Sequence, residues 1–379
     1  MGPMRLTHRS HVSHKSHRFA EPSAPQVSDT PPMPCRCARS RSFTAFSLVR
    51  GVDDIAAVDQ GTAMLDLFGP AFDRDWVAAR LKALAEAQVY VGTSSWKYEG
   101  WLGMLYDRAN YENRGRFSKT RFEQECLHEY GQYFPSVCVD AGYYRFPDER
   151  YLEKLINQVP TNFKFTWKVT DEITLRRFPN LPRFGDRRGQ LNPNFLNAKL
   201  SNNSFIRLLE PYRGQIGSLI FEFAEFRPAD FQGPDDFLAQ LDRFLQALPS
   251  GWPYSVEIRT ENFFTDEYLR VLAKHGVAHV LSQWSYMPEV SEQLKRPGIF
   301  TADFRVARFL LRRGRPYERA VQIFSPYRET REVNADARTT ARRLVFDLPL
   351  NEGKPLFIYI NNRLEGNALN TIWSIIRGD

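Results

Sequence analysis

Apolar residues follow two different periods along this chain, and the change from one to the other delimits the predicted elements. Residues 163–169 and 254–259 alternate between apolar and polar positions, which is typical of β-strands. Residues 118–134 and 234–248 carry apolar side chains three and four positions apart, which is typical of amphipathic helices. Strand-like and helix-like segments follow each other in turn, and this order predicts an α/β protein with a parallel sheet.

The same patterns predict eight strands and the helices between them. We expect strands at residues 89–91, 137–139, 163–169, 218–223, 254–259, 277–281, 304–311 and 356–361. We expect helices at residues 73–87, 118–134, 151–159, 203–212, 234–248, 265–275, 335–346 and 367–376, with Asp73 and Thr265 as N-caps. The weakest strand pattern is that of 304–311. Eight strands followed by helices predict a TIM (β/α)8 barrel in a single domain.

The beginning of the chain differs in composition from the rest. It is rich in Ser, Pro, Arg and His and has little apolar periodicity, so it cannot bury enough surface to offset the entropy of ordering. We therefore expect residues 1–63 to be a disordered basic extension. Residues 64–88 then contain a leading helix, and residues 89–379 form the barrel.

Two features of this extension raise the question of a role. His8, His11, His14 and His17 recur every three residues, and Cys35 and Cys37 follow. A His-rich tract can bind transition metals weakly. The alternatives are an extension without function and an over-called start, with translation beginning at Met64.

Net charge at first suggests an acidic partner, because the chain carries +7. Residues 1–50 hold eight of the 51 basic residues and two of the 44 acidic ones, which leaves 43 basic and 42 acidic residues elsewhere. The body of the protein is therefore almost neutral, and this balance disfavours a nucleic-acid-binding protein.

Cysteine usage and hydropathy indicate the compartment. Cys126 and Cys138 fall on a helical face and in a strand, so both are expected to be buried thiols rather than parts of a disulfide framework. No segment reaches the ~18 consecutive apolar residues that a membrane span needs, and no apolar signal core opens the chain. We expect a cytoplasmic protein without membrane contact.

Polar side chains stand at the carboxyl ends of several predicted strands. Because side chains alternate along a strand, Glu257 and Arg259 share one face, opposite Val256 and Ile258. The same alternation and the parallel strands bring a set of polar residues to one mouth of the barrel: Asp140, Lys168, Glu222, Glu257, Arg259 and Asn361. These residues form either a ligand site or a salt-bridge network that stabilises the mouth.

Two of the segments that follow strands are long. Residues 97–117 are aromatic, and residues 171–200 are rich in Arg, Asn and Pro. Long loops without secondary structure are usually lids or binding loops, although surface loops also tolerate insertions.

Several segments in order resemble the YecE-like proteins, the domain of unknown function 72 family. Residues 92–101 (GTSSWKYEGW) are similar to its opening motif, and residues 143–147 (YYRFP), 163–168, 256–259 (VEIR), 359–362 (YINN) and 366–368 are similar to later ones. The similarity extends from residue 89 to residue 373. The resemblance implies a TIM barrel and leaves the reaction open.

Some positions depart from the typical family pattern. Cys138, Asp140 and Glu222 stand where typical members have other residues. Thr260 and Leu175 replace two His residues, and Phe263 replaces a Trp. The chain therefore resembles a divergent member, and roles that depend on those His residues do not carry over.

These residues favour an enzyme that acts on a small polar metabolite, anionic or sugar-like. Glu257 or Asp140 is the expected general acid/base, and Lys168 and Arg259 are expected to hold negative charge. Residues expected to shape the pocket are Ser94, Trp96, Tyr144, Arg145, Glu222, Asn361 and Asn362. Hydrolase, lyase and isomerase chemistry, including glycoside hydrolysis by two carboxylates, all stay open.

Cofactor use follows from the same residues. His128, His275 and His279 are the only His residues outside the extension, and this number disfavours a His-rich zinc cluster. No cofactor is predicted, although Mg²⁺ or Mn²⁺ on Asp140, Glu222 and Glu257 stays open. Walker, Gly-x-Gly-x-x-Gly, His-Glu-x-x-His and Gly-x-Ser-x-Gly motifs do not occur.

Two alternatives differ in class from an enzyme of small metabolites. In a nucleic-acid-binding or endonuclease-like protein, phosphates would be bound by Arg176, Arg177, Arg183, Arg187 and Arg188, and bases would stack on Trp101, Tyr106 or Tyr111. A non-catalytic ligand-binding barrel would share the same pocket and lack turnover. The oligomeric state stays open.

Overall fold

A computed structural model describes residues 72–347 and 353–377 of the chain. The predicted disordered extension, residues 1–63, lies outside the described residues, together with its His tract, Cys35, Cys37 and Met64. Within the described ranges, no helix combines the length and the apolar character that a membrane crossing requires.

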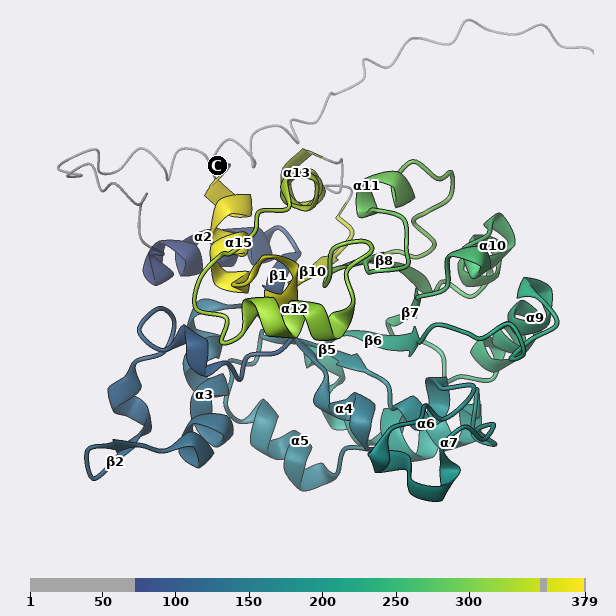
Figure 1. Ribbon diagram of the computed structural model, residues 1–379, viewed down its shortest axis with the longest axis horizontal. Helices are drawn as coiled ribbons and strands as arrows, with labels where there is room; N and C mark the ends of the chain where they lie inside the picture. Colours follow the sequence, from purple (N-terminus) through teal and green to yellow (C-terminus); the bar gives the residue numbers. More distant parts are fainter. Residues whose placement is uncertain (1–71, 348–352, 378–379) are drawn as a thin grey trace, which may run out of the picture. The chain divides into compact units, whose positions relative to one another are not determined.

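In the described part of the chain, eight parallel strands close into a barrel (Figure 1). They are β1 (Val89–Thr93), β4 (Ser136–Val139), β5 (Lys164–Lys168), β6 (Ile216–Phe223), β7 (Tyr254–Ile258), β8 (Ala278–Gln283), β9 (Arg305–Phe309) and β10 (Leu356–Ile360). Neighbours in this order pair with each other, and β1 closes the ring by pairing with both β10 and β4. The predicted TIM barrel is confirmed, including its seventh strand.

Helices surround these strands (Figure 1). The longer ones are α2 (Arg74–Glu86), α3 (Lys119–Tyr133), α5 (Glu149–Ile156), α9 (Pro234–Gln246), α10 (Asp266–Lys274), α12 (Tyr317–Phe324), α13 (Ala335–Arg342) and α15 (Ala368–Arg377). The shorter ones are α4 (Ala141–Tyr144), α6 (Asp171–Thr174), α7 (Ala198–Ser201), α8 (Arg207–Leu209), α11 (Val290–Gln293) and α14 (Asn362–Glu365). Asp73 and Thr265 cap α2 and α10 as predicted, each by accepting hydrogen bonds from backbone amides of the first turn.

The helices differ from the prediction at 203–212 and after β9, and the short helices α4, α6, α7, α11 and α14 were not predicted. The single helix expected at 203–212 is a π-helical turn (Asn202–Ile206), then α8, then a 3₁₀ helix (Glu210–Gln215). Pro211 explains the change, because proline has no amide hydrogen to continue an α-helix. Helix α12, with only eight residues, follows β9 and was not predicted.

The aromatic segment after β1 is not the structureless loop that its composition predicted. It contains 3₁₀ helices at Glu99–Trp101 and Arg108–Tyr111 and a hairpin of β2 (Glu112–Asn113) and β3 (Arg116–Phe117). Trp101, Tyr106 and Tyr111 are buried there, and the rings of Tyr106 and Tyr111 contact Phe122 of α3 edge-on. The segment is therefore part of the core rather than a lid.

The barrel interior is filled by alternate residues of each strand. Its apolar cluster consists of Cys138, Ile220, Val280, Val306, Phe357 and Tyr359. The hydroxyl of Tyr359 spans the interior, 2.7 Å from the Ser136 hydroxyl and 2.6 Å from that of Thr166. Cys138 is buried as predicted, and burial raises the pKa of its thiol to about 12. The interior is a packed floor beneath the mouth.

Glycine is required where β1 meets β4. A Cβ at Gly92 would lie 2.1 Å from the carbonyl oxygen of Ser136, well inside contact distance. That carbonyl also accepts a hydrogen bond of 2.9 Å from the Tyr130 hydroxyl of α3. The strand predicted at 89–91 does not end before Gly92, because β1 continues to Thr93, and Gly92 is instead a point of close backbone approach.

Candidate functional site

Every barrel strand contributes one inward polar residue at the C-terminal mouth. Side chains two positions apart on a strand point to the same face. The residues two positions beyond the interior residues therefore face the barrel axis again; these interior residues are Cys138, Ile220, Val280, Val306 and Tyr359 of the cluster, and Thr166, which contacts the Tyr359 hydroxyl. The mouth residues, in barrel order, are Ser94, Asp140, Lys168, Glu222, Glu257, Ser282, Arg308 and Asn361. Arg259, immediately after β7, joins them.

Glu222 of β6 is the centre of an ion cluster. Its Oε2 atom lies 2.9 Å from Lys168 Nζ, 2.7 Å from Arg259 and 2.8 Å from Arg308. Burial by itself would raise the pKa of Glu222, but the charges of Arg259, Lys168 and Arg308 outweigh burial and hold that pKa well below its usual range. Glu222 therefore stays ionised.

Glu257 of β7 is enclosed by its partners. Its Oε1 accepts hydrogen bonds from Arg259 Nε at 2.8 Å and from Ser282 Oγ at 3.1 Å, and its Oε2 accepts one from Arg308. The side chain is 0% exposed. A carboxylate with both oxygens bonded and no exposed surface is a poor acceptor for a substrate proton.

Arg308 of β9 was missed by the sequence analysis and connects all three carboxylates. It lies 3.5 Å from Asp140 and 2.8 Å from Glu222, and it contacts Glu257. Burial would lower the pKa of this guanidinium, but the surrounding anions, Glu257 foremost, raise it. Arg308 lies two residues beyond the inward Val306, so the alternation of residues 304–311 contains the signal for it. That strand pattern is weak, and the sequence did not show which of its residues face inward.

Asp140 is the carboxylate of the cluster that reaches the surface. It follows β4 directly, and its Oδ1 lies 3.6 Å from Lys168 Nζ. Its side chain is 28% exposed, whereas those of Glu222 and Glu257 are 2% and 0% exposed. Of the three acidic residues, Asp140 is therefore the one that a ligand reaches.

Two aromatic rings cover cations of the cluster. Lys168 Nζ lies 4.0 Å from the ring centroid of Tyr143, and the guanidinium of Arg259 lies 3.8 Å from that of Trp284. Such cation–π contacts restrict the cations to one position. Neither ring was predicted, because a cation–π contact between distant segments leaves no local pattern in a sequence.

The remaining predicted pocket residues separate into buried and exposed ones. Trp96 is in the core, and its carbonyl accepts a 2.6 Å hydrogen bond from Tyr106. Asn362 is buried and accepts a 2.7 Å hydrogen bond from the amide of Ala368, so it determines where α15 begins. Tyr144 is 61% exposed, and Arg145 is exposed as well. Both belong to the segment between β4 and α5, beside Asp140.

The carboxylates of the mouth do not fit a metal ion. Divalent cations such as Mg²⁺ need several carboxylate or carbonyl oxygens directed at one point. Here Arg308 contacts Asp140, Glu222 and Glu257, so a guanidinium already occupies the position between them. No group of three His, Cys, Asp or Glu residues within the described ranges is arranged as a metal site.

The arginine-rich segment 171–200 is folded, and its arginines have partners within the protein. It contains α6, a 3₁₀ helix at Pro182–Arg187 and α7. Three arginines pair with carboxylates: Arg177 with Asp230, Arg183 with Asp171 and Arg187 with Glu172. Arg176 and Arg188 donate hydrogen bonds to the backbone carbonyls of Asp230 and Gly185. Trp101, Tyr106 and Tyr111, on which bases would stack in the nucleic-acid alternative, are buried.

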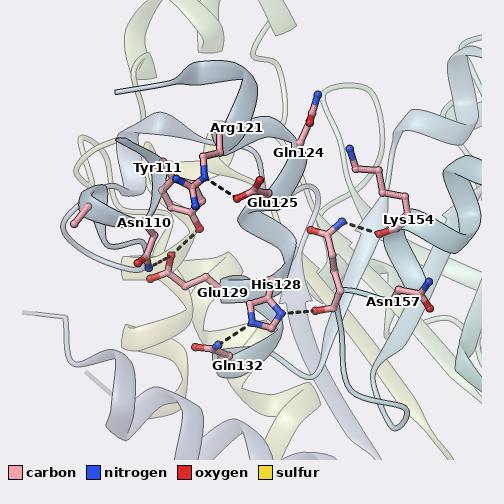
Figure 2. Close-up of a pocket in the computed structure, with 12 residues that line it drawn as sticks. Asn110, Tyr111, Arg121, Gln124, Glu125, His128, Glu129, Gln132, Lys154 and Asn157 are labelled. Carbon is pink, nitrogen blue, oxygen red and sulfur yellow. Dashed lines mark hydrogen bonds and ion pairs between the residues drawn. The ribbon is translucent and has the colours of Figure 1, made fainter. Parts of the chain in front are cut away.

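A groove of about 820 Å³ lies away from the mouth, on the outer helices (Figure 2). It is bordered by α3, by the 3₁₀ helix Arg108–Tyr111 and by the end of α5. Figure 2 shows its side chains bonded to one another, as Arg121 is to Glu125 and Tyr111 to Glu129. None of the catalytic or pocket residues predicted for the barrel mouth lines it, so the mouth remains the candidate site.

Fold and site together define a TIM-barrel protein with a buried ion cluster at the face where such barrels carry their active sites. The chain belongs to the DUF72 family, described as "Protein of unknown function DUF72", whose family model matches residues 90–377.

Solved structures of the same family share this fold. A DUF72 family protein from Thermotoga maritima is 18% identical, with a TM-score of 0.50 over 76% of this chain and 97% of the other. A DUF72 family protein from Enterococcus faecalis is 16% identical, with a TM-score of 0.50 over 77% and 97%. Both identities are low, so the likeness is one of fold. No curated protein matches the chain.

Proposed function

We propose that the protein is an enzyme that transfers a proton to or from a small polar, anionic metabolite at the mouth of the barrel. The observation that carries this proposal is the position of Asp140, the one exposed carboxylate of a buried ion cluster. A general acid/base must reach its substrate, and this requirement favours Asp140 over Glu257.

The other charged residues have supporting roles in this proposal. Lys168 lies beside Asp140 and stabilises negative charge that develops on the substrate when a proton leaves. Glu222 and Glu257 position Lys168 and Arg259 through the contacts given above. This arrangement suits proton abstraction next to a carbonyl group, the chemistry of many isomerases and lyases, better than glycoside hydrolysis. Glycoside hydrolysis requires two accessible carboxylates, and here two of the three are enclosed.

The test begins with a thermal-shift screen of phosphorylated and carboxylated metabolites, because a ligand of the folded state raises the melting temperature. Each hit is then incubated with the protein and followed by mass spectrometry, and proton exchange with deuterated water is followed by NMR. We expect turnover or exchange by the wild type and a loss of about 10²- to 10⁴-fold in Asp140→Asn.

Two results would contradict the proposal. Equal activity of Asp140→Asn and wild type would remove Asp140 from the chemistry. Ligands that bind the wild type without turnover or exchange would instead support the non-catalytic ligand-binding barrel.

A further inference from the structure

A further cation lies in the segment that follows the last barrel strand, and no carboxylate of the described residues forms an ion pair with it. Arg363 forms no ion pair with any residue of the ranges 72–347 and 353–377. Its guanidinium instead lies over the ring of Tyr317, 4.6 Å from the centroid. The three cations of the ion cluster, Lys168, Arg259 and Arg308, are each paired with carboxylates. The cluster contains three carboxylates, so its charges balance. Arg363 therefore adds to this end of the barrel a positive charge that no ion pair within the described ranges compensates.

Hydrogen-bond donors without partners lie beside this charge. Ser94 and Asn361 follow directly on the paired residues Thr93 and Ile360 of β1 and β10, so they are neighbours at the mouth. Both side chains are at least nine-tenths buried. Ser94 Oγ and Asn361 Nδ2 have no hydrogen-bond partner in the described part of the chain. Buried donors without acceptors are costly, and a ligand oxygen would relieve that cost.

A hydrogen bond to the side-chain oxygen of Asn361 fixes the orientation of its amide group. Its Oδ1 accepts a 2.9 Å hydrogen bond from the backbone amide of Arg363, which caps α14. This bond leaves the Nδ2 group as the free donor and ties the backbone of Arg363 to the end of β10. The backbone of Arg363 and the side chain of Asn361 are therefore held together at the end of β10.

The segments after β1 and β9 pack against each other beside Arg363 and Asn361. Gly100 approaches the backbone of Pro326 so closely that a Cβ there would lie 2.0 Å from its carbonyl oxygen. The rings of Tyr98 and Tyr327 meet edge-on at 5.5 Å. Burial raises the pKa of the Tyr98 hydroxyl to about 12. The positive charge of Arg363 opposes this rise and the negative charge of Asp140 adds to it, so both charges act on this one hydroxyl. This hydroxyl stays protonated at neutral pH and is a further donor.

We propose that Arg363, with Ser94 and Asn361, is a subsite for an oxyanion, a phosphate or carboxylate group of the ligand. TIM barrels frequently bind phosphate with the loops after their seventh and eighth strands, which here are β9 and β10. A planar guanidinium suits both groups, because it donates two parallel hydrogen bonds. The inference rests on the proposed function, whose ligand class it names: the anionic group lies at Arg363 and the reacting atom near Asp140.

The test is isothermal titration of the full-length protein with inorganic phosphate and, separately, with acetate. We expect binding by the wild type and at least about tenfold weaker binding by Arg363→Gln, since hydrogen bonds from charged groups are the strong ones. Arg319→Gln is the matched control, because Arg319 is an exposed arginine of α12. It removes the same charge from the same region and should change affinity by less than about twofold. Tighter binding of phosphate or of acetate identifies which group the ligand carries.

Further measurements keep the result decisive. Circular dichroism shows whether Arg363→Gln is folded, and Asn361→Ala, which should also weaken binding, replaces it if it is not. Equal binding by wild type and Arg363→Gln, or no binding of either anion by the wild type, would overturn the subsite. Asp140→Asn is expected to bind phosphate as well as the wild type does. Loss of turnover together with retained anion binding would therefore separate a failure of the catalytic proposal from a failure of the subsite.

Discussion

The ammonium of Lys168 lies 3.6 Å from the carboxylate of Asp140 and 2.9 Å from that of Glu222. One carboxylate is exposed and the other is buried, so a single cation connects the surface of the mouth to its interior. In a barrel, residues at the carboxyl ends of strands serve function and those at the opposite ends serve stability. Lys164 and Lys168 occupy the two ends of β5, so this strand allows the distinction to be tested.

Replacing Lys168 with Gln is expected to reduce turnover of the substrate found by the screen by about 10²-fold, because a preorganised positive charge is lost. Lys164→Gln is the control. The ammonium of Lys164 donates a hydrogen bond to the carbonyl of Gly214 at the end of the barrel opposite the mouth. This change should therefore leave turnover unaltered. Steady-state kinetics of both variants measure the difference. Equal effects at the two ends of the strand would contradict the assignment.

Replacing Glu222 with Gln is expected to destabilise the fold, because Lys168, Arg259 and Arg308 lose the oxygen that they share. Breaking a buried ion cluster costs about 3–5 kcal/mol of unfolding free energy. Chemical denaturation measures this loss. Glu225→Gln, an exposed residue three positions further on, should change the unfolding free energy by less than about 0.5 kcal/mol. A Glu222 variant as stable as that control would show that the cluster contributes nothing to the fold.

The buried His279 of β8 should make stability depend on pH. Burial lowers the pKa of this imidazole to about 4, while the unfolded chain keeps a value of about 6.5. The folded state therefore prefers the neutral ring. Its contribution to stability is complete above pH ~6.5 and is lost as the pH falls towards 4, by up to about 3 kcal/mol. Denaturant unfolding at several pH values measures this slope.

The control for this prediction is His128, an exposed residue of α3. His279→Asn should remove most of the slope between pH 6.5 and 4, whereas His128→Asn should keep it. A slope unchanged in His279→Asn would assign the pH dependence to other groups.

Gly92→Ala should destabilise the barrel, because the new methyl group would lie 2.1 Å from the Ser136 carbonyl oxygen and the strands cannot separate without losing their pairing. We expect a loss of about 3 kcal/mol or more in unfolding free energy, in the range of severe packing changes. Gly214→Ala provides the comparison, since no atom lies within 4 Å of a Cβ at that position. If both variants melt at the same temperature, β1 and β4 are less tightly packed than the structure indicates.

Periodicity alone predicted most of the fold. Strand and helix periods are local properties, so the barrel strands, the caps Asp73 and Thr265 and the inward position of Glu257 all followed from neighbouring residues. An exception arose where a local pattern was interrupted, because Pro211 divides the helix expected at 203–212. Helix α12 was not predicted, although α5 and α13 have the same length and were.

The set of residues that share the mouth followed from the sequence, but the accessibility of each one did not. Alternation and parallel strands bring Asp140, Lys168 and Glu257 to one face, and nothing local shows which carboxylate is enclosed. Only the closed barrel places Arg308 between the three carboxylates and leaves Arg363 without an ion pair among the described residues. The contact of Arg308 with Asp140 joins β9 to the end of β4, and these segments are far apart in the sequence. The order of residues determines the period of an element, whereas burial and charge compensation depend on which distant elements meet.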